Sequence, residues 1–503
     1  MEGGRPQGAP RSTALAFEDL VHPYLGAYTR SPQWVKSSLG WAYARLPKPW
    51  RLGWDHRRWE ALASERRPEE LGRDARQRLG RTLQIALETV PAYAAYRHLR
   101  SALDRPSEVL QQLPLVSKLE IKKDLQAYLS TASPAARRLE CFTGGSTANP
   151  MRFFLERHVT RTREYAFMAD FHARVGYTER DRVLALRGRT VPSAAGGGRL
   201  WMYEPIKRQL ILSTDHLSPA NMPEYVEAMR RWSPTLVQAF PSALYPVAKW
   251  LALHPAPDVT GRIKGILLYS ETVHDYQYDL FERVFGCPVL RHYGHSERGV
   301  MAASMPGDDR YFFWPQYGHM ELVDAEGRRV DAPGALGEIV CTSFDNAVMP
   351  FVRYRTGDLG VLSTHPNDTL PGFPVLERIQ GRLQEMVQCR DGRLISITTL
   401  GAAHFNELSD VTAIQYEQHQ PGLVELKVET RAPLSGRSKA LIADAVHDKT
   451  QGGCEVKILE VPQIARTPAG KQLMLIQHLD LSREFAAPDA RMPAGGSTPH
   501  TGG

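Results

Sequence analysis

The middle of the chain alternates short runs rich in β-branched residues with amphipathic stretches, and this alternation constrains the fold more than any other feature. We expect strands at residues 183–187, 236–239, 265–269 and 288–293. We expect the intervening helices at 222–232, 243–254 and 275–285. Strands that alternate with helices are typical of an α/β domain with a largely parallel sheet. Ligands of such sheets bind at the carboxyl ends of the strands, so the loops there are candidate positions for a site.

Different patterns flank this region. From Glu69 to Arg97 the apolar residues recur at helical spacing, which predicts a long amphipathic helix. After about residue 313, antiparallel strands joined by turns are indicated at 319–327, 337–344 and 351–360. The segment from about 383 to 481 then has its own order of strand, strand, helix and strand, at 412–418, 423–429, 435–447 and 454–460. The sequence therefore predicts a second, small α+β domain.

Length and composition exclude several classes of protein. A chain of 503 residues, 42% hydrophobic and 23% charged, is typical of a globular protein with more than one domain. No window reaches the ~18 apolar residues of a membrane span, and the N-terminus has no apolar segment typical of a secretion signal. The five cysteines are scattered and form no CxxC pair, which argues against a disulfide scaffold or a cysteine-pair zinc site. The net charge of +7 favours an anionic partner: nucleic acid, lipid or nucleotide.

A glycine- and threonine-rich segment occupies residues 141–150, CFTGGSTANP. Glycines let backbone N–H groups turn toward an anion, and Thr143, Ser146 and Thr147 add hydroxyl donors. The segment is not a Walker A loop, because no Gly-Lys-Ser/Thr follows the glycines. It fits either a phosphate-binding loop or an ordinary surface loop.

The segment 292–299, HYGHSERG, directly follows an expected strand and has two interpretations. It nearly matches the GxSxG nucleophile elbow of hydrolases, with Ser296 as nucleophile, but Arg298 stands where that elbow needs a small residue. Alternatively, Glu297 is an acidic residue in a loop after a strand, which is a natural position for a Mg²⁺ ligand.

Two later segments carry one candidate residue each. Asp358, in YRTGDL, can accept hydrogen bonds from both hydroxyls of a ribose, or it is a plain turn residue. Lys471, in RTPAGK, can present its ammonium to a phosphate or a polarised oxygen, or it is a solvated surface lysine.

Taken together, the order and spacing of these segments resemble the adenylate-forming ligase superfamily, and within it the phenylacetate–CoA ligase and CapK-type (coenzyme F390 synthetase-like) branch. The resemblance runs from about residue 75 to 480 and includes VPAYAAYR (90–97), LPLVSKLEIKKDL (113–125), AFPSALY (239–245), SETVHDYQYDLFERVFG (270–286) and IQGR (379–382). It implies a large N-terminal α/β domain, residues 1–380, that binds ATP and a carboxylic acid. It also implies a small, mobile α+β lid domain at 383–484. We expect residues 1–12 to be mobile and 485–503 to be a disordered tail.

The resemblance also implies roles for individual residues. The phosphates would be held by Thr143, Gly144, Gly145, Ser146 and Thr147, and Mg²⁺ by Glu297. Adenine would be flanked by Glu271, Tyr293 and Gly294. Asp358 would bind ribose, Arg382 would reach the nucleotide from the interdomain hinge, and Lys471 would stabilise charge between the carboxylate and the α-phosphate. The acid pocket would contain Phe240, Pro241, Tyr269, His292 and His295, which suits an aryl or small polar acid.

The implied activity is that of an AMP-forming ligase: ATP activates a carboxylic acid as an acyl-adenylate, pyrophosphate leaves, and CoA or an amine accepts the acyl group. We expect a cytoplasmic monomer or homodimer that uses ATP and Mg²⁺, with CoA as a further candidate, and that has no nucleic-acid or membrane partner. Three alternatives stay open: adenylyl transfer to a hydroxyl as in F390 synthetase-like enzymes, a serine hydrolase built on Ser296, and a non-catalytic nucleotide-binding scaffold.

The sequence departs from the pattern of this superfamily in two places. The phosphate loop ends at 148–151 in Ala-Asn-Pro-Met, where many relatives have Gly-x-Pro followed by Lys or Thr. The hinge after Arg382 reads Leu-Gln-Glu-Met, where many relatives have an aspartate pair, and Glu385 is the candidate replacement. The second departure bears on domain alternation and CoA use more than on adenylation.

Overall fold

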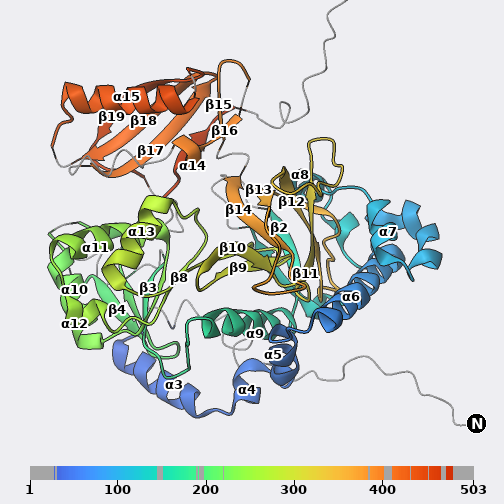
Figure 1. Cartoon of the computed structure of the whole chain (residues 1–503). Helices are drawn as coiled ribbons and strands as arrows, with labels where there is room; N and C mark the ends of the chain where they lie inside the picture. Colours follow the sequence, from blue (N-terminus) through green and yellow to red (C-terminus); the bar gives the residue numbers. More distant parts are fainter. Residues whose placement is uncertain are drawn as a thin grey trace, which may run out of the picture.

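The computed structural model describes residues 28, 31–143, 151–187, 191, 198–218, 220–382, 386–392, 394–400, 411–430, 432–450, 452–465 and 472–479. A twelve-stranded sheet forms the centre of the larger part of this structure, and a separate four-stranded sheet lies above it in Figure 1. The large sheet has the strand order β11-β12-β13-β14-β10-β9-β8-β7-β6-β3-β5-β4. The mixed α/β fold expected from the sequence is confirmed.

One half of the large sheet is parallel and contains the predicted alternation of strands and helices. Its strands are β3 (Val183–Leu186), β5 (Gln209–Leu212), β6 (Leu236–Ala239), β7 (Ile266–Leu268) and β8 (Val289–Gly294), with β4 (Trp201–Glu204) antiparallel at the edge. The helices between them are α10 (Met222–Trp232), α11 (Pro241–Leu253), α12 (Pro257–Thr260) and α13 (Asp275–Phe285). Most predicted boundaries are correct to within two residues, because buried parallel strands appear in sequence as short continuous apolar runs.

The other half is antiparallel. It comprises β9 (Met301–Met305), β10 (Asp308–Phe313), β11 (Gly318–Val323), β12 (Leu336–Ser343), β13 (Tyr354–Leu362) and β14 (Val375–Arg382). Strand β8 joins the halves, since Val289–Arg291 pair in parallel with β7 and His292–Gly294 pair antiparallel with β9. The loop after β8 therefore lies where the sheet changes from parallel to antiparallel.

Most of the described chain before β3 is helical. Its helices include α3 (Gln33–Arg45), α4 (Lys48–Leu52), α5 (His56–Ala63), α6 (Pro68–Thr89), η2 (Pro91–Ala102), α7 (Pro106–Gln111), α8 (Lys118–Lys123) and α9 (Thr160–Ala173). The long helix predicted to reach Arg97 ends at Thr89 instead. Pro91 lacks an N–H and disfavours helical geometry at the residue before it, so Val90 is extended and the chain continues as the 3₁₀ helix η2.

The C-terminal part contains the α+β unit that the sequence predicted. Its strands β17 (Val411–Gln420), β18 (Leu423–Thr430), β19 (Glu455–Val461) and β20 (Leu475–Gln477) are ordered β19-β18-β17-β20. Helix α15 (Gly436–Thr450) packs on one face of this sheet through a core that includes Leu426, Val428, Ile442 and Val446. The short hairpin β15 (Met386–Gln388) and β16 (Leu394–Ser396) leads into α14 (Ile397–Leu400).

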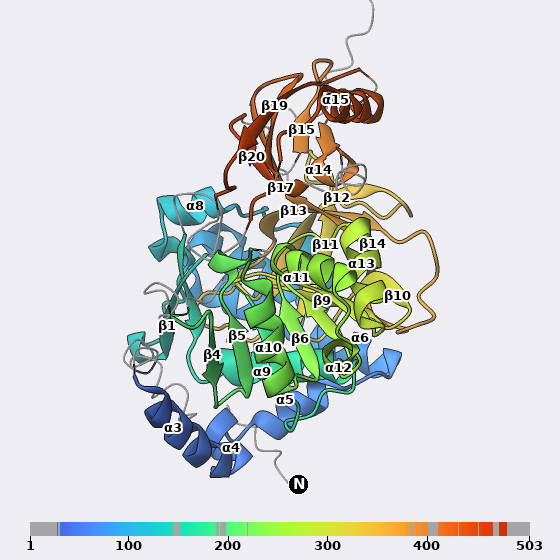
Figure 2. The same cartoon turned by 90° about the vertical axis from the view of Figure 1, so that its left-hand side faces the viewer.

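Two helices of the large part support the small sheet (Figures 1 and 2). The ammonium of Lys249, on α11, donates a hydrogen bond to the carbonyl of Val411 at 3.0 Å. Tyr276, on α13, packs against the small core and meets the ring of Tyr245 edge-on, with centroids 5.3 Å apart. Through these contacts, α11 and α13 of the large part pack against the small sheet.

A buried ion pair ties the antiparallel half to the N-terminal helices. Arg353 and Glu321 are 5% and 3% exposed, and their charged groups lie 3.3 Å apart. Gln111 donates to the same carboxylate, and Arg353 donates to the carbonyl of Leu113. The pair therefore forms part of a hydrogen-bonded network that connects β11 to helix α7 and the residues after it.

Replacing Glu321 with leucine should lower the free energy of unfolding by about 3–5 kcal/mol, because the guanidinium of Arg353 would stay buried without its counter-charge. Urea denaturation at neutral pH measures this change. The control is Asp331→Asn, which breaks a solvent-exposed pair with Arg329 and should cost at most about 1 kcal/mol. Equal losses in the two variants would contradict the role assigned to the buried pair.

No helix among the described residues combines the length and the apolarity that a membrane span requires. The expectations for residues 1–12 and 485–503 fall outside the described residues. The domain boundaries proposed at 380 and 383 stay predictions.

Candidate active site

The loop after β8 buries a carboxylate between two donors. Glu297 is 7% exposed and accepts a hydrogen bond from the hydroxyl of Tyr354, on β13, at 2.8 Å. Its other oxygen lies 3.2 Å from Nδ1 of His295. Burial alone would raise the pKa of Glu297, but the hydrogen bond and charge of His295, together with the Tyr354 hydroxyl, hold that pKa at about 2. Glu297 is therefore ionised at neutral pH.

His295 links Glu297 to a buried thiol on β12. Its Nε2 lies 3.7 Å from Sγ of Cys341, whose side chain is fully buried. Burial on its own would lower the pKa of His295, but contact with Cys341 and Glu297 outweighs it and raises that pKa well above the usual value. Burial raises the pKa of the Cys341 thiol. The loop thus holds an imidazolium beside the Glu297 carboxylate.

A second contact between distant segments lies at the end of β8. The hydroxyl of Tyr293 donates to Oδ2 of Asp358, on β13, at 2.8 Å. Burial and the nearby Asp358 raise the pKa of Tyr293, so its hydroxyl stays a neutral donor. Asp358 is 7% exposed, and the register of β13 with β14 pairs it with Arg382, whose side chain is not described. The YGHSE, YRTGD and IQGR segments therefore converge at one corner of the sheet.

Aromatic rings and imidazoles gather at the carboxyl ends of the neighbouring parallel strands. The hydroxyl of Tyr269, after β7, lies 2.9 Å from Nε2 of His172 on α9, and its ring lies 5.3 Å from that of His292. The Arg187 guanidinium, after β3, lies 4.2 Å from the Tyr269 ring centroid. Nε2 of His292 is buried and has no hydrogen-bond partner among the described residues. Burial lowers the pKa of both His172 and His292 to about 3, so both rings are neutral.

The other predicted contacts lie close to this corner in the fold. Phe240 is buried at the start of α11, and Pro241 is the first residue of that helix, directly after β6. Glu271 accepts hydrogen bonds from the backbone and the hydroxyl of Ser242, both at 3.0 Å, at the positive end of α11. That contact gives Glu271 a structural function, whereas the adenine contact expected for it stays a prediction. Gly294 ends β8, where a Cβ atom would lie 3.1 Å from the His292 ring.

Thr143 closes the base of the predicted phosphate loop. Strands β1 (Arg138–Phe142) and β2 (Arg152–Glu156) form an antiparallel hairpin on either side of it. The backbone N–H of Thr143 donates to the carbonyl of Met151 at 2.9 Å, and its hydroxyl accepts from the Met151 N–H at 2.8 Å. The other predicted residues of the loop, Gly144, Gly145, Ser146 and Thr147, lie outside the described residues, as does Lys471.

The chain is similar to known proteins in part of its sequence and in its fold. No family model matches the chain. Protein CapK of Staphylococcus aureus is 23% identical over 314 residues, which are 62% of this chain and 67% of CapK. Phenylacetate-coenzyme A ligase of Pseudomonas putida is 26% identical over 227 residues, 43% of this chain and 50% of the ligase. The solved structure of 2-hydroxyisobutyryl-CoA ligase in the postadenylation state, bound to R3-HIB-AMP, has the same fold: TM-score 0.60, 20% identity, 81% of this chain and 90% of that one.

The chain is thus similar in sequence to proteins of the adenylate-forming superfamily and shares the fold of the CoA ligase. Both sequence relatives come from the branch that the motifs resembled. The corner at the end of β8, where the motifs that carry this similarity converge, is therefore the candidate active site, and the residue roles assigned there stay proposals.

Three residues of this candidate site were missed in the sequence. Tyr354 stands in the same motif as Asp358, and alternation along a strand would have placed 354, 356 and 358 on one face. Cys341 and His172 carried no signal, since each is an isolated residue in a strand or a helix. Their proximity to His295 and Tyr269 exists only in the folded chain.

The hydrolase interpretation of Ser296 is not favoured by the local geometry. Both ring nitrogens of the adjacent His295 face other groups, Glu297 and Cys341, so this imidazole is not placed as a base for Ser296. Arg298 adopts a left-handed backbone conformation, with φ of 55°, and donates to both the carbonyl and the hydroxyl of Thr160. Its side chain therefore supports the loop by contact with α9.

Replacing Tyr293 with phenylalanine should raise the KM for ATP by about tenfold, with a smaller effect on kcat, because Asp358 loses the donor that orients it. Initial rates of adenylation at varied ATP concentration measure this change. Tyr311→Phe, which alters another buried tyrosine of the large sheet, is the control. An unchanged KM for ATP in Tyr293→Phe would contradict the nucleotide-binding role predicted for Tyr293.

Proposed function

We propose that this protein is an AMP-forming ligase that uses ATP to activate a carboxylic acid as an acyl-adenylate, releases pyrophosphate, and transfers the acyl group to CoA or an amine. The observation that carries the proposal is the pairing of Tyr293 with Asp358 and of Tyr354 with Glu297, across 65 and 57 residues of sequence. The names of the relatives support it, since they include a phenylacetate-coenzyme A ligase and a CoA ligase bound to an acyl-adenylate.

The chemistry explains why such residues are needed. Attack of a carboxylate on the α-phosphate brings two anions together, and their repulsion must be offset by cationic groups and hydrogen-bond donors. In the proposal, Lys471 supplies a cation at this point, and the loop that begins at Thr143 donates to the β- and γ-phosphates. The Asp358 carboxylate, oriented by Tyr293, accepts hydrogen bonds from the ribose hydroxyls.

Glu297 fits a Mg²⁺ ligand in its chemistry. It is an ionised carboxylate, and each oxygen that already accepts from Tyr354 or His295 has a second lone pair. Mg²⁺ binds to one or two carboxylates together with phosphate oxygens, and when bound it neutralises charge on the phosphates. The neighbouring His295 imidazolium competes for the same carboxylate.

The acid is proposed to bind where Tyr269, His172 and His292 meet. Neutral imidazoles and a buried phenol offer hydrogen bonds on an aromatic surface, which suits an aryl or small polar acid. We propose in addition that CoA or an amine is the acceptor, that the C-terminal unit from about residue 383 moves between half-reactions, and that the protein works in the cytoplasm.

Carboxylate-dependent ATP–pyrophosphate exchange with a panel of aryl and small polar acids tests the proposal. We expect exchange with a subset of the acids, and hydroxylamine should trap each adenylate as a hydroxamate. The mass of the final product then separates the acceptors, because a thioester or an amide differs from a stable nucleotidyl ester. No exchange with any acid, or a nucleotidyl ester as product, would contradict the proposed function.

A further inference from the structure

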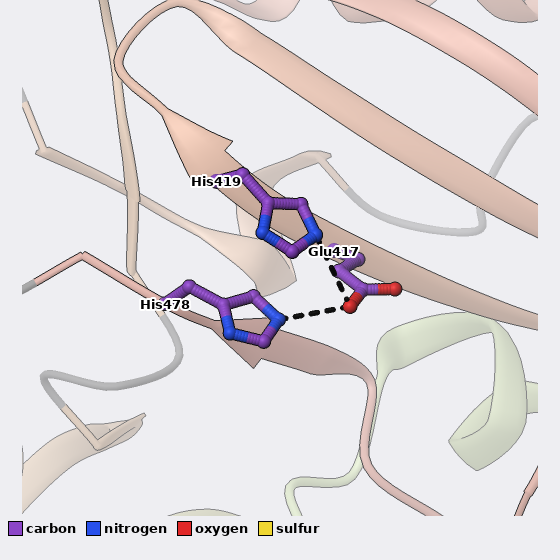
Figure 3. A group of neighbouring side chains, drawn as sticks. All are labelled: Glu417, His419 and His478. Atoms are coloured by element: carbon purple, nitrogen blue, oxygen red, sulfur yellow. Dashed lines mark hydrogen bonds and ion pairs between the residues drawn. The ribbon is translucent and has the colours of Figure 1, made fainter.

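Three potential metal ligands converge on the small sheet, away from the candidate active-site residues described above. Glu417 and His419 are on β17, and His478 directly follows β20 (Figure 3). The Nε2 atoms of the two imidazoles both point to the same carboxylate oxygen of Glu417, at 3.3 Å for His419 and 2.8 Å for His478. One ligand atom from each residue lies within 4.8 Å of the other two.

The strand register explains the convergence. Along β17, Ile414 and Tyr416 point into the small core, so Glu417 and His419 lie on the opposite face of the sheet. Strand β20 pairs in parallel with β17, with Gln418 opposite Gln477. The His478 N–H continues this ladder by donating to the carbonyl of Gln418 at 3.0 Å. His478 is therefore held beside His419, and the two rings stack with centroids 4.0 Å apart and an angle of 11°.

These distances fit a tetrahedral ion. Zinc bonds of about 2.0–2.1 Å to nitrogen and oxygen separate neighbouring ligand atoms by roughly 3.4 Å. The observed separations of 2.8 and 3.3 Å are close to that value, and the nearly parallel rings must rotate for both Nε2 lone pairs to face one ion. The imidazoles are 57% and 43% exposed, so water can complete the coordination.

We propose that Glu417, His419 and His478 form a binding site for a divalent transition-metal ion of the zinc class. Each imidazole coordinates through Nε2 with its proton on Nδ1, and Glu417 supplies the anionic oxygen. Two nitrogens, one carboxylate and a water are a ligand set that zinc accepts, whereas Mg²⁺ and Ca²⁺ prefer oxygen ligands alone.

Lys427, on the neighbouring strand β18, is the competing cation. Its ammonium pairs with the second oxygen of Glu417 and, with His478, lowers the pKa of that carboxyl against the opposing effect of burial. A bound ion would have to share Glu417 with this ammonium. Removing the Lys427 charge should therefore tighten metal binding, which an ordinary ion-pair network on the sheet surface would not predict.

A bound ion would also fasten β20 to β17. Strand β20 pairs with β17 over only three residues and begins four residues after Lys471. A metal ion bound by both His419 and His478 would link the two strands just past their last paired residues, Gln418 and Gln477. Backbone amides near residues 475–479 should therefore exchange hydrogen more slowly when the metal is bound.

The test is titration of the full chain with Zn²⁺ by calorimetry and with Co²⁺ by absorption spectroscopy, without any nucleotide or acid. We expect one binding site. His419→Ala or His478→Ala should lower its metal affinity at least about tenfold, because even the loss of a residue that hydrogen-bonds to a metal ligand has an effect of that size. Lys427→Met should bind up to about fivefold more tightly, the limit set by a surface ion pair of about 1 kcal/mol. His365→Ala, which removes an exposed histidine elsewhere, is the control and should leave metal affinity unchanged. The titration does not measure adenylation, so its result does not depend on the proposed function.

Two outcomes would overturn the proposal. One is equal Zn²⁺ binding by the wild type and by the double variant His419→Ala/His478→Ala, with hydrogen exchange near residues 475–479 unaffected by the metal. The other is a Co²⁺ spectrum with thiolate charge-transfer bands that disappears in Cys389→Ser. That result would place the ion at the buried thiols of Cys389 and Cys454, whose sulfur atoms lie 3.6 Å apart.

Discussion

Replacing Glu297 with glutamine is expected to lower kcat for carboxylate-dependent ATP–pyrophosphate exchange by about 100- to 1,000-fold, the range found when one preorganised electrostatic group is removed. The substitution keeps the shape of the side chain and an oxygen that can accept from Tyr354. It removes the negative charge that we propose as the Mg²⁺ ligand, and it places an amide beside the His295 imidazolium. Exchange rates at saturating ATP and acid measure the effect.

The control for this experiment is Glu326→Gln, which neutralises an exposed carboxylate in the turn after β11 and should leave exchange unchanged. Thermal unfolding of both variants shows whether the fold is intact. Wild-type exchange by a folded Glu297→Gln variant would show that Glu297 is a structural acid, held only by Tyr354 and His295, and would end its proposed role.

Replacing Lys471 with alanine is expected to lower exchange by at least about 100-fold, because Lys471 is the cation that the proposal places between the carboxylate and the α-phosphate. The second half-reaction should survive, since a preformed acyl-adenylate no longer has that repulsion to overcome. Supplying a chemically made adenylate together with CoA or an amine, and measuring its consumption, separates the two half-reactions. Lys471→Arg should restore little exchange, because a planar guanidinium does not replace a compact ammonium.

Lys457→Ala is the matched control, since Lys457 is an exposed lysine of the same C-terminal unit and pairs with Glu425 at 2.8 Å. It should leave both half-reactions unchanged. Equal exchange by Lys471→Ala and wild type would contradict the assignment of Lys471. Equal loss of both half-reactions would indicate instead that the substitution disturbs the small sheet.

Much of the fold could be predicted from periodicity alone. The runs at 236–239 and 288–293 are strands within a residue or two, because buried parallel strands have no polar face to interrupt them. Exceptions are the strand expected at 319–327, which ends at Val323, the strand expected at 351–360, which begins at Tyr354, and the helix expected to reach Arg97, which ends at Thr89. In the helix, the apolar spacing continues past Pro91, where the helical backbone ends. Local backbone chemistry at Pro91 outweighed hydrophobic periodicity.

The candidate site was predictable only in part. Glu297 and Asp358 stood out because each is an acid at the end of a strand-like run, within a recognisable motif. Nothing in the sequence pairs Tyr293 with Asp358 or Cys341 with His295, since the partners are 65 and 46 residues apart. The pKa of Glu297, about 2, likewise depends on two donors from different segments.

Local sequence patterns were enough to predict the class of fold, the order of most strands and helices, and a short list of candidate acids and bases. Those features depend on neighbours along the chain: apolar spacing, glycine and proline positions, and motifs of a few residues. Which of those residues lie in contact depends on the folded chain. Folding brings Glu297 to Tyr354, places Glu271 in hydrogen-bond contact with Ser242 at the start of α11, and places His478 beside His419. Contacts of this kind are set by strand register and burial across the whole sheet, which no local pattern encodes.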